Sequence, residues 1–177
     1  MAANLSSEMD DTDKVVKLIG SVKKMGMEIM FPDVNTSAGE FVAVNESRIA
    51  YGMAAIKNQG TKASVAIAQY REKKGVFKTL HDLCSIDSHV INRKSLEALV
   101  QAGACDSLVG HRAQQFAAID EALRWGQKFN EEALSSQESL FGGDSALSAV
   151  AAPVLPDVEE WSVEECLKRE KDSIGFY

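Results

Sequence analysis

The sequence predicts a mainly helical protein with one small β-hairpin and a flexible, acidic segment toward its C-terminal end. Three observations support this fold class. The 177 residues include only 3 prolines and 12 glycines, so few positions interrupt helices. Apolar residues, 45% of the chain, recur at helical spacing through most of it. Residues 135–156 instead combine serine, glycine and proline with little that could be buried, which is typical of a flexible surface segment.

The first predicted helix begins at Asp11 or Thr12, since either side chain can cap a helix N-terminus. Gly26 supplies a natural end. One face of this helix carries its apolar residues at helical spacing: Val15, Val16, Ile19, Val22 and Met25. Asp10, Asp11 and Asp13 resemble a carboxylate cluster, but at this position they are more simply partners of the helix dipole.

The β-hairpin is expected shortly after this helix. Residues 31–35 should form an extended linker, because the residue before Pro32 is disfavoured in the helical region. Residues 41–44 and 49–52 then flank a turn at residues 45–48, as in a small hairpin. Helical patterns dominate the rest, over about residues 53–57, 61–73, 78–84, 92–102, 110–129 and 162–172.

Charge is distributed unevenly along the chain. The net charge of −7 speaks against a purely electrostatic nucleic-acid binder. Residues 130–177, however, hold eleven acidic and three basic side chains, which leaves a charge of +1 on residues 1–129. Residues 57–78 hold six basic side chains against one acidic. The chain thus has a basic centre and an acidic end.

The basic centre contains a pattern typical of a helix-hairpin-helix. A short apolar helix at residues 53–57 is followed by a tight turn ending in Gly60 and by a second helix. Such a turn presents unpaired backbone N–H groups at a helix N-terminus, where the dipole favours an anion such as a DNA phosphate. Such a site recognises the backbone of DNA rather than its base sequence. The predicted DNA-binding residues are Lys57, Asn58, Gln59, Gly60, Thr61, Lys62 and Arg71.

Two features leave this interpretation open. A plain helical corner with a solvated basic face would give the same pattern. Asn58 also stands where the motif usually has its first glycine; asparagine tolerates the left-handed region, so the turn can form while the approach of a phosphate is less certain.

A second copy of the layout follows at residues 91–116, with Asn92 as a helix cap and a core stripe of Leu96, Leu99 and Val100. The two copies could form a tandem unit. Because the second turn is longer and contains Asp106, we expect this copy mainly to support packing.

Residues 7–17, 25–35, 51–57, 77–84, 92–108 and 175–177 closely resemble, in order, the alpha subunit of bacterial DNA polymerase III. The resemblance implies an excised piece of a longer polymerase. Its expected parts are the end of the fingers-region helix and a linker (1–33), a tandem helix-hairpin-helix domain that binds DNA and the clamp (34–130), and a flexible clamp-motif segment with a C-terminal helix (131–177). An oligonucleotide-binding fold would follow beyond the end of the chain.

The resemblance also gives a role to residues 137–141, Gln-Glu-Ser-Leu-Phe. They have the form of peptides that bind the sliding clamp (beta subunit), and they occupy the place where the family carries its clamp motif. Leu140 and Phe141 can enter an apolar pocket while the Gln137 amide makes directed hydrogen bonds, and Ser139 completes the predicted site. Further expected partners are duplex DNA and, through the full-length protein, other replicase subunits.

The family's catalytic acids precede this segment, so the piece alone should be inactive. The resemblance implies Mg²⁺ for the full-length polymerase, and we expect no cofactor in this piece. A helix-hairpin-helix glycosylase is rejected, since no Pro-Val-Asp-like aspartate follows Arg71. An acidic helical adaptor that binds only proteins remains the alternative.

Metal sites, disulfides and membrane spans are not expected. The histidines (His81, His89 and His111) lack metal-ligand spacing, and the cysteines (Cys84, Cys105 and Cys166) are too far apart for a paired site. No apolar run approaches the roughly 18 residues that a membrane span needs. The first residues lack the pattern of a signal peptide, and we therefore expect a soluble, cytoplasmic protein.

Overall fold

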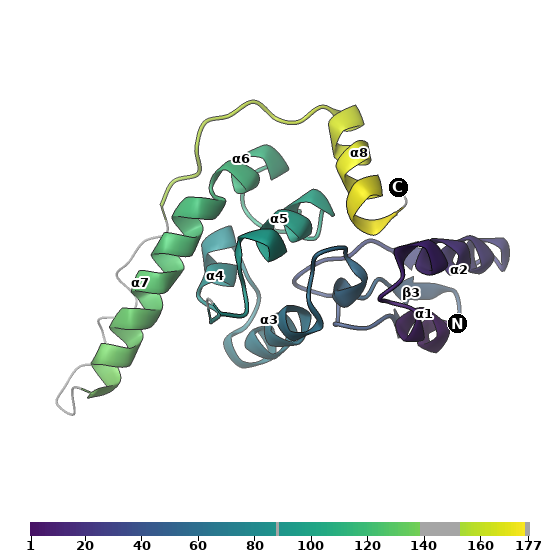
Figure 1. Ribbon diagram of the computed structural model, residues 1–177, viewed down its shortest axis with the longest axis horizontal. Coiled ribbons are helices and arrows are strands. Elements are labelled where there is room, and N and C mark those ends of the chain that lie inside the picture. The colour runs from purple at the N-terminus through teal and green to yellow at the C-terminus, as the bar shows by residue number, and fades with distance from the viewer. Residues whose placement is uncertain (88, 139–152, 176–177) are drawn as a thin grey trace.

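The computed structural model describes residues 1–87, 89–138 and 153–175. The molecule is elongated, with a small sheet and two helices at one end, short helices in the middle and a long helix at the other end (Figure 1). The C-terminal helix returns across the molecule, so that its last residues lie near the helices at the N-terminal end (Figure 1). One hydrophobic core runs from Leu5 to Ile174.

The N-terminal end is formed by helices α1 (Ala2–Ser7) and α2 (Thr12–Lys24). The predicted cap of α2 is confirmed, because the Asp11 carboxylate accepts a hydrogen bond of 3.1 Å from the backbone N–H of Lys14. The buried side chains of α2 are Val15, Ile19 and Val22. Helix α1, which buries Leu5, was not predicted.

The predicted hairpin is confirmed and belongs to a sheet of three strands. β2 (Val42–Ala43) pairs antiparallel with β3 (Arg48–Ala50), with Val42 opposite Ala50. β1 (Glu28–Met30), which the sequence did not predict, pairs parallel with β3, and Ile29 lies opposite Ile49. The strand order β1-β3-β2 places β3 in the middle, which explains why Ile49 is buried.

Helices follow at all the positions expected, with two differences. They are η1 (Met53–Ala55), α3 (Thr61–Lys74), α4 (Leu80–Cys84), α5 (Arg93–Gln101), α6 (Arg112–Ala117), α7 (Ile119–Glu138) and α8 (Val163–Ile174). The first is a single 3₁₀ turn rather than an α-helix. The helix expected over residues 110–129 is two helices, which break at Ala118, and the second continues to Glu138.

Helix α8 is held against the middle of the fold by charged and aromatic contacts. The Arg112 guanidinium donates a hydrogen bond of 2.7 Å to Glu170 of α8, whose side chain is largely buried. The Arg169 guanidinium lies 3.9 Å from the centre of the Trp161 ring, which itself packs on Phe116 of α6. α8 and the segment before it therefore form part of the same packed body as the two hairpins.

The predicted flexible segment falls largely outside the described residues. Residues 135–138 continue α7, and residues 153–156 run as irregular chain along α6, where Gln114 donates a hydrogen bond of 3.2 Å to the carbonyl of Pro156. Within the described parts of the chain, no helix combines the length and apolar character that crossing a membrane requires.

Candidate nucleic-acid interface

The turn between η1 and α3 forms the first hairpin. The backbone N–H of Gln59 donates a hydrogen bond of 2.9 Å to the carbonyl of Ile56, which closes the turn. Asn58 has a φ of 68°, in the left-handed region. Asparagine thus occupies the position for which the motif usually has a glycine, as the sequence suggested, and the turn forms with it.

The N-terminus of α3 is open to solvent. Gly60 is its N-cap and provides no side-chain acceptor, and Ser64 is the first residue whose N–H bonds to the Gly60 carbonyl. Within the described part of the chain, the N–H groups of Gly60, Thr61 and Lys62 donate no hydrogen bond. Such unpaired donors, together with the helix dipole, favour an anion.

Two exposed lysines flank this open end. Lys57 precedes the turn and Lys62 lies in the first turn of α3, and both side chains point into solvent. Gly60 and Thr61 are exposed between them, and a Cβ added to Gly60 would meet no atom within 4 Å. The predicted residues Lys57, Gly60, Thr61 and Lys62 are therefore all exposed around this one turn.

The side chains of Gln59 and Arg71, also predicted to bind DNA, have partners inside the protein. Gln59 is buried and its amide oxygen accepts a hydrogen bond from the hydroxyl of Ser95 in α5. The Arg71 guanidinium donates hydrogen bonds of 2.8 and 3.0 Å to the carbonyls of Val34 and Ser37. Both side chains fix the position of the hairpin, and their contact with DNA stays a prediction.

An open pocket of about 460 Å³ lies beside the first hairpin. It is lined by the hairpin, by α5 and by the end of α8, through Lys57, Asn58, Lys94, Glu97, Ala98, Gln101, Asp172 and Ser173. The backbone N–H of Lys57 donates a hydrogen bond of 2.9 Å to the carbonyl of Ser173. The sequence reasoning did not single out Lys94, although a lysine in the first turn of a helix is a signal that could have found it.

The second hairpin, between α5 and α6, is closed. Its helix α6 begins at His111, whose ring nitrogen accepts a hydrogen bond from the N–H of Gln114, while the Gln114 side chain accepts one from the N–H of His111. A Cβ added to Gly110 would lie 2.2 Å from Leu155, because the chain leading to α8 covers this turn. In the second hairpin the N–H groups of His111 and Gln114 are thus capped and the turn is covered, as expected of a copy that supports packing.

The charged group of the second hairpin is also occupied. Arg112 donates hydrogen bonds of 2.7 and 2.6 Å to the two carboxylate oxygens of Asp106, in addition to its bond with Glu170. These contacts satisfy the guanidinium with acids of the same chain, so they leave little of it for a phosphate.

The residues of the predicted clamp peptide are mostly outside the described part of the chain. Gln137 lies in the last turn of α7, which ends at Glu138. Ser139, Leu140 and Phe141 lie outside the described residues.

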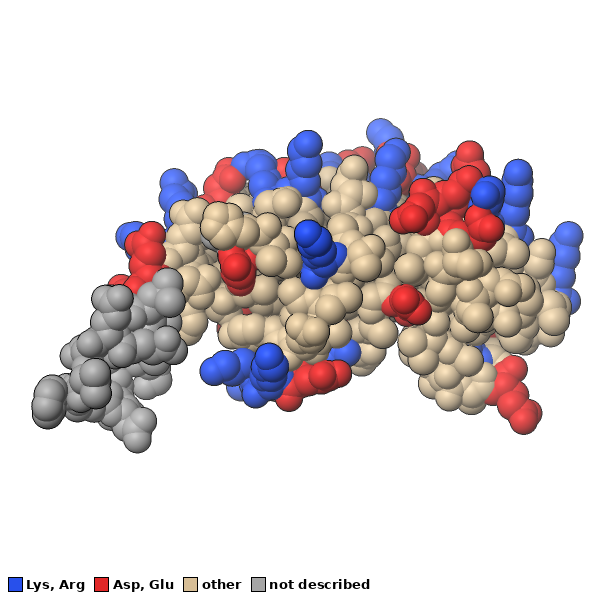
Figure 2. All heavy atoms as spheres, turned by 60° about the horizontal axis from the view of Figure 1, so that its bottom comes forward, with Lys and Arg blue, Asp and Glu red and all other residues tan. Residues whose placement is uncertain are grey.

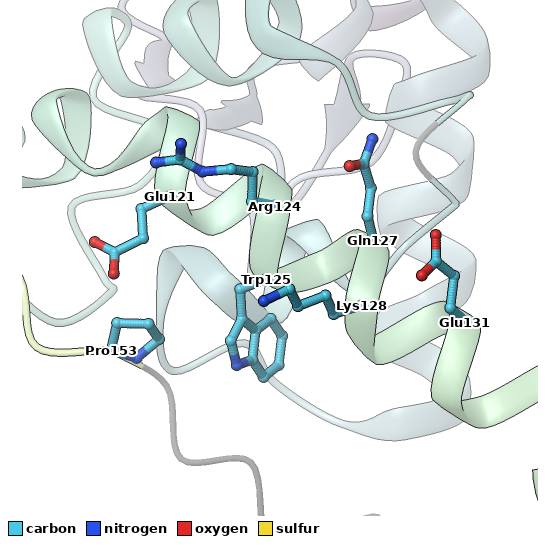
Figure 3. A pocket seen from close by; sticks show the side chains of 7 residues that line it. All are labelled: Glu121, Arg124, Trp125, Gln127, Lys128, Glu131 and Pro153. Atoms are coloured by element: carbon cyan, nitrogen blue, oxygen red, sulfur yellow. The ribbon is translucent and has the colours of Figure 1, made fainter.

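A further pocket of about 510 Å³ lies along α7. Figure 3 shows Trp125 and Lys128 next to each other on one side of the helix, with Pro153 opposite Glu121. Its charged lining residues are two acids, Glu121 and Glu131, and two bases, Arg124 and Lys128. This lining does not favour an anion over a cation.

The surface shows no extended basic patch on the face seen in Figure 2, where basic and acidic side chains lie interspersed along the upper edge. On this face a polyanion would find no broad attraction. Binding to DNA therefore depends on the local arrangement of donors and charges at a turn.

The described residues contain no group of three or more histidine, cysteine or acidic side chains that could hold a metal ion. Cys84 and Cys105 are buried free thiols, and burial raises the pKa of Cys84 to about 12. His81 is buried, and desolvation lowers the pKa of its ring.

The sequence matches known proteins along its whole length. Residues 26–115, just over half of the chain, match the family described as "Helix-hairpin-helix motif". All of the chain aligns with the DNA polymerase III subunit alpha of Xylella fastidiosa at 36% identity, and with those of Pseudomonas aeruginosa and Thermus aquaticus at 37%. The chain spans only 14–16% of the length of these three relatives. It therefore belongs to the helix-hairpin-helix family and corresponds throughout to a segment of the DNA polymerase III alpha subunits.

Proposed function

We propose that this chain acts within a replicative DNA polymerase III alpha subunit, where it holds the backbone of duplex DNA through the first hairpin and tethers the enzyme to the sliding clamp through residues 137–141. The catalytic activity belongs to the whole polymerase, and this segment contributes binding to DNA and to the clamp.

The observation that carries DNA binding is the open N-terminus of α3. The N–H groups of Gly60, Thr61 and Lys62 have no partner among the residues that the structure describes. Exposed lysines flank this turn, and the side chain of Gln59 is directed inward. This combination suits one phosphate group at the helix end and contacts no base, so binding is independent of sequence. The acidic end of the chain opposes DNA through its own charge, and affinity in isolation is therefore modest.

The test of the hairpin is a charge reversal with a matched control. We expect the variant Lys57→Glu/Lys62→Glu to lose binding to a fluorescent duplex, measured by anisotropy at several salt concentrations. The control Lys17→Glu/Lys24→Glu changes two exposed lysines of α2 and thus changes net charge equally. It should keep most of the affinity, because neither lysine belongs to the turn or lines the pocket beside it.

The salt dependence separates a specific contact from general repulsion. Each neutralised phosphate contributes a slope of about −0.9 to a plot of log affinity against log salt, so losing the phosphate at the helix end should reduce the magnitude of the slope by about 0.9. Equal affinity of the hairpin variant and the parent would remove the first hairpin from the DNA-binding surface. The absence of any DNA binding, with clamp binding retained, would favour an acidic adaptor that binds only proteins.

The clamp contact is carried by the Gln-x-x-Leu-Phe pattern and by its place in the polymerase family. Burying Leu140 and Phe141 in an apolar groove is worth about 1.5–3 kcal/mol for each side chain. The variant Leu140→Ala/Phe141→Ala should therefore weaken clamp binding by a hundredfold or more, measured by surface plasmon resonance or calorimetry.

The matched control removes apolar atoms elsewhere. Val154→Ala/Val163→Ala truncates two exposed side chains near the same end of the chain and should leave clamp binding unchanged. In the intact polymerase, the clamp-peptide variant should shorten the product made per binding event and leave single-nucleotide insertion unaltered. If that variant binds clamp like the parent, or if it unfolds the domain, the tether hypothesis is wrong.

A further inference from the structure

Lys94 occupies an electrostatically unfavourable position that stability does not explain. It lies in the first turn of α5, where the positive end of the helix dipole disfavours a cation. Its neighbour Arg93 lies in the same turn but is paired with Glu97 and Asp120. Within the described parts of the chain Lys94 has no ion pair, and its side chain is exposed.

The first turn of α5 is fixed directly against the first hairpin. The Ser95 hydroxyl donates a hydrogen bond to the Gln59 side chain, so the residue next to Lys94 holds the turn next to Lys57. Lys94, Lys57 and Asn58 consequently line one open pocket. A polyanion bound at the start of α3 would extend into this pocket, where it would meet Lys94 of α5.

Two acids line the same pocket, and they differ in their pairing. Glu97 accepts a hydrogen bond of 2.7 Å from Arg93, which offsets its charge. Asp172 has no ion-pair partner among the described residues, and it lies in the last turn of α8, where the helix dipole disfavours an anion. An unpaired cation and an unpaired anion thus meet at this pocket, each at the helix end that disfavours it.

We infer that Lys94 is a further phosphate-binding residue, which extends the contact with the DNA backbone from the first hairpin onto α5, and that Asp172 limits the affinity of this contact by repelling the same phosphate. This inference rests on the proposed function of the first hairpin. It goes further by adding a second helix to the binding surface and an acid that opposes it.

The test of Lys94 is the neutral variant Lys94→Gln, with Lys17→Gln on α2 as its control. One phosphate contact contributes about −0.9 to the slope of log affinity against log salt, so it strengthens binding about eightfold at 0.1 M salt relative to 1 M. We therefore expect Lys94→Gln to bind duplex about eightfold more weakly at 0.1 M salt, with a slope reduced by about 0.9. Lys17→Gln should change neither quantity.

Folding is not expected to obscure this result. Replacing Lys94 by glutamine removes an unfavourable interaction with the dipole of α5, so unfolding in urea should occur at the same or a slightly higher concentration. The same argument applies to Asp172→Asn at the other helix end, and circular dichroism checks both variants.

The test of Asp172 predicts an effect of opposite sign. Asp172→Asn should bind duplex about threefold more tightly at low salt, because a unit charge a few ångströms from a phosphate repels it and salt screens the effect. Replacement of Asp157, an exposed acid outside the pocket, by asparagine is the control and should have little effect.

The outcomes separate this inference from the proposed function. If the Lys57/Lys62 double variant loses DNA while Lys94→Gln binds like the parent, the hairpin stands and the extension onto α5 is wrong. If Asp172→Asn leaves affinity unchanged, the opposing role of the acid is refuted. If the parent binds no duplex, both the function and the inference fail.

Discussion

Gly126 gives a sharp test of the packing between α4 and α7. It lies buried in the middle of α7, and a Cβ added there would be 2.0 Å from the carbonyl oxygen of Cys84 and 2.6 Å from its carbonyl carbon. Both atoms belong to the backbone at the end of α4, so no side chain can rotate away. Alanine at this position requires the two helices to separate by about 1 Å, since such contacts are rarely shorter than about 3 Å.

Two effects of Gly126→Ala oppose each other. Alanine is favoured over glycine within a helix by up to about 1 kcal/mol. Overpacking a close-packed interior costs about 1–3 kcal/mol, and a backbone clash belongs at the upper end of that range. We therefore expect the clash to win and the variant to lose about 2 kcal/mol of unfolding free energy.

The same substitution at Gly20 provides the control. Gly20 is exposed within α2, and a Cβ added there meets nothing within 4 Å, so Gly20→Ala should gain about 0.5–1 kcal/mol. The two variants should differ by about 1 M in the midpoint of urea unfolding, followed by circular dichroism. If Gly126→Ala is as stable as the parent or more stable, α7 does not approach α4 as closely as described.

Two further predictions concern buried polar groups. The pKa of His81 is lowered by desolvation, which outweighs the opposing charges of Glu121 and Asp82, so the native ring is neutral while the unfolded ring binds a proton near pH 6.5. The unfolding free energy should therefore fall as pH drops below about 6.5. The variant His81→Leu should show a smaller fall than the parent when both are unfolded in urea across pH 5–8. An unchanged pH dependence would contradict the attribution of this fall to His81. Arg112→Met should lower the free energy of unfolding by about 3 kcal/mol, because it leaves the buried Glu170 unpaired. Adding Glu170→Met should recover much of that loss. A double variant as unstable as Arg112→Met alone would show that loss of the ion pair is not the cause.

Elements defined by local signals could be predicted from the sequence. Helix α2 begins at Thr12 because the capping acceptor Asp11 lies next to it in the chain, and its buried stripe repeats at helical spacing. The turn containing Asn58 was also predictable, since the tolerance of asparagine for the left-handed region is a local property. Such signals need no knowledge of the rest of the fold.

Elements that depend on distant partners were missed. β1 contains only three residues, Glu28–Met30, and becomes a strand because it pairs with β3, twenty positions later in the chain. The break at Ala118 carries neither glycine nor proline, so the sequence predicted one continuous helix there. The inward position of the Gln59 side chain likewise depends on Ser95, in another helix.

The two hairpins show how one motif can serve two purposes within a single domain. In the second copy the helix N-terminus is capped by His111 and Gln114, the following chain covers Gly110, and Arg112 is neutralised by acids. These contacts join α8 to α5 and α6, and α8 in turn supplies the Ser173 carbonyl that holds the backbone of Lys57. The second hairpin thus stabilises the position of the first, whose own helix end carries only Gly60 as a cap and remains open. A backbone donor can bind a ligand only where the protein neither uses it nor covers it. Of the two hairpins in the described residues, the first has no side-chain cap and no covering segment at its helix end, and exposed lysines flank it.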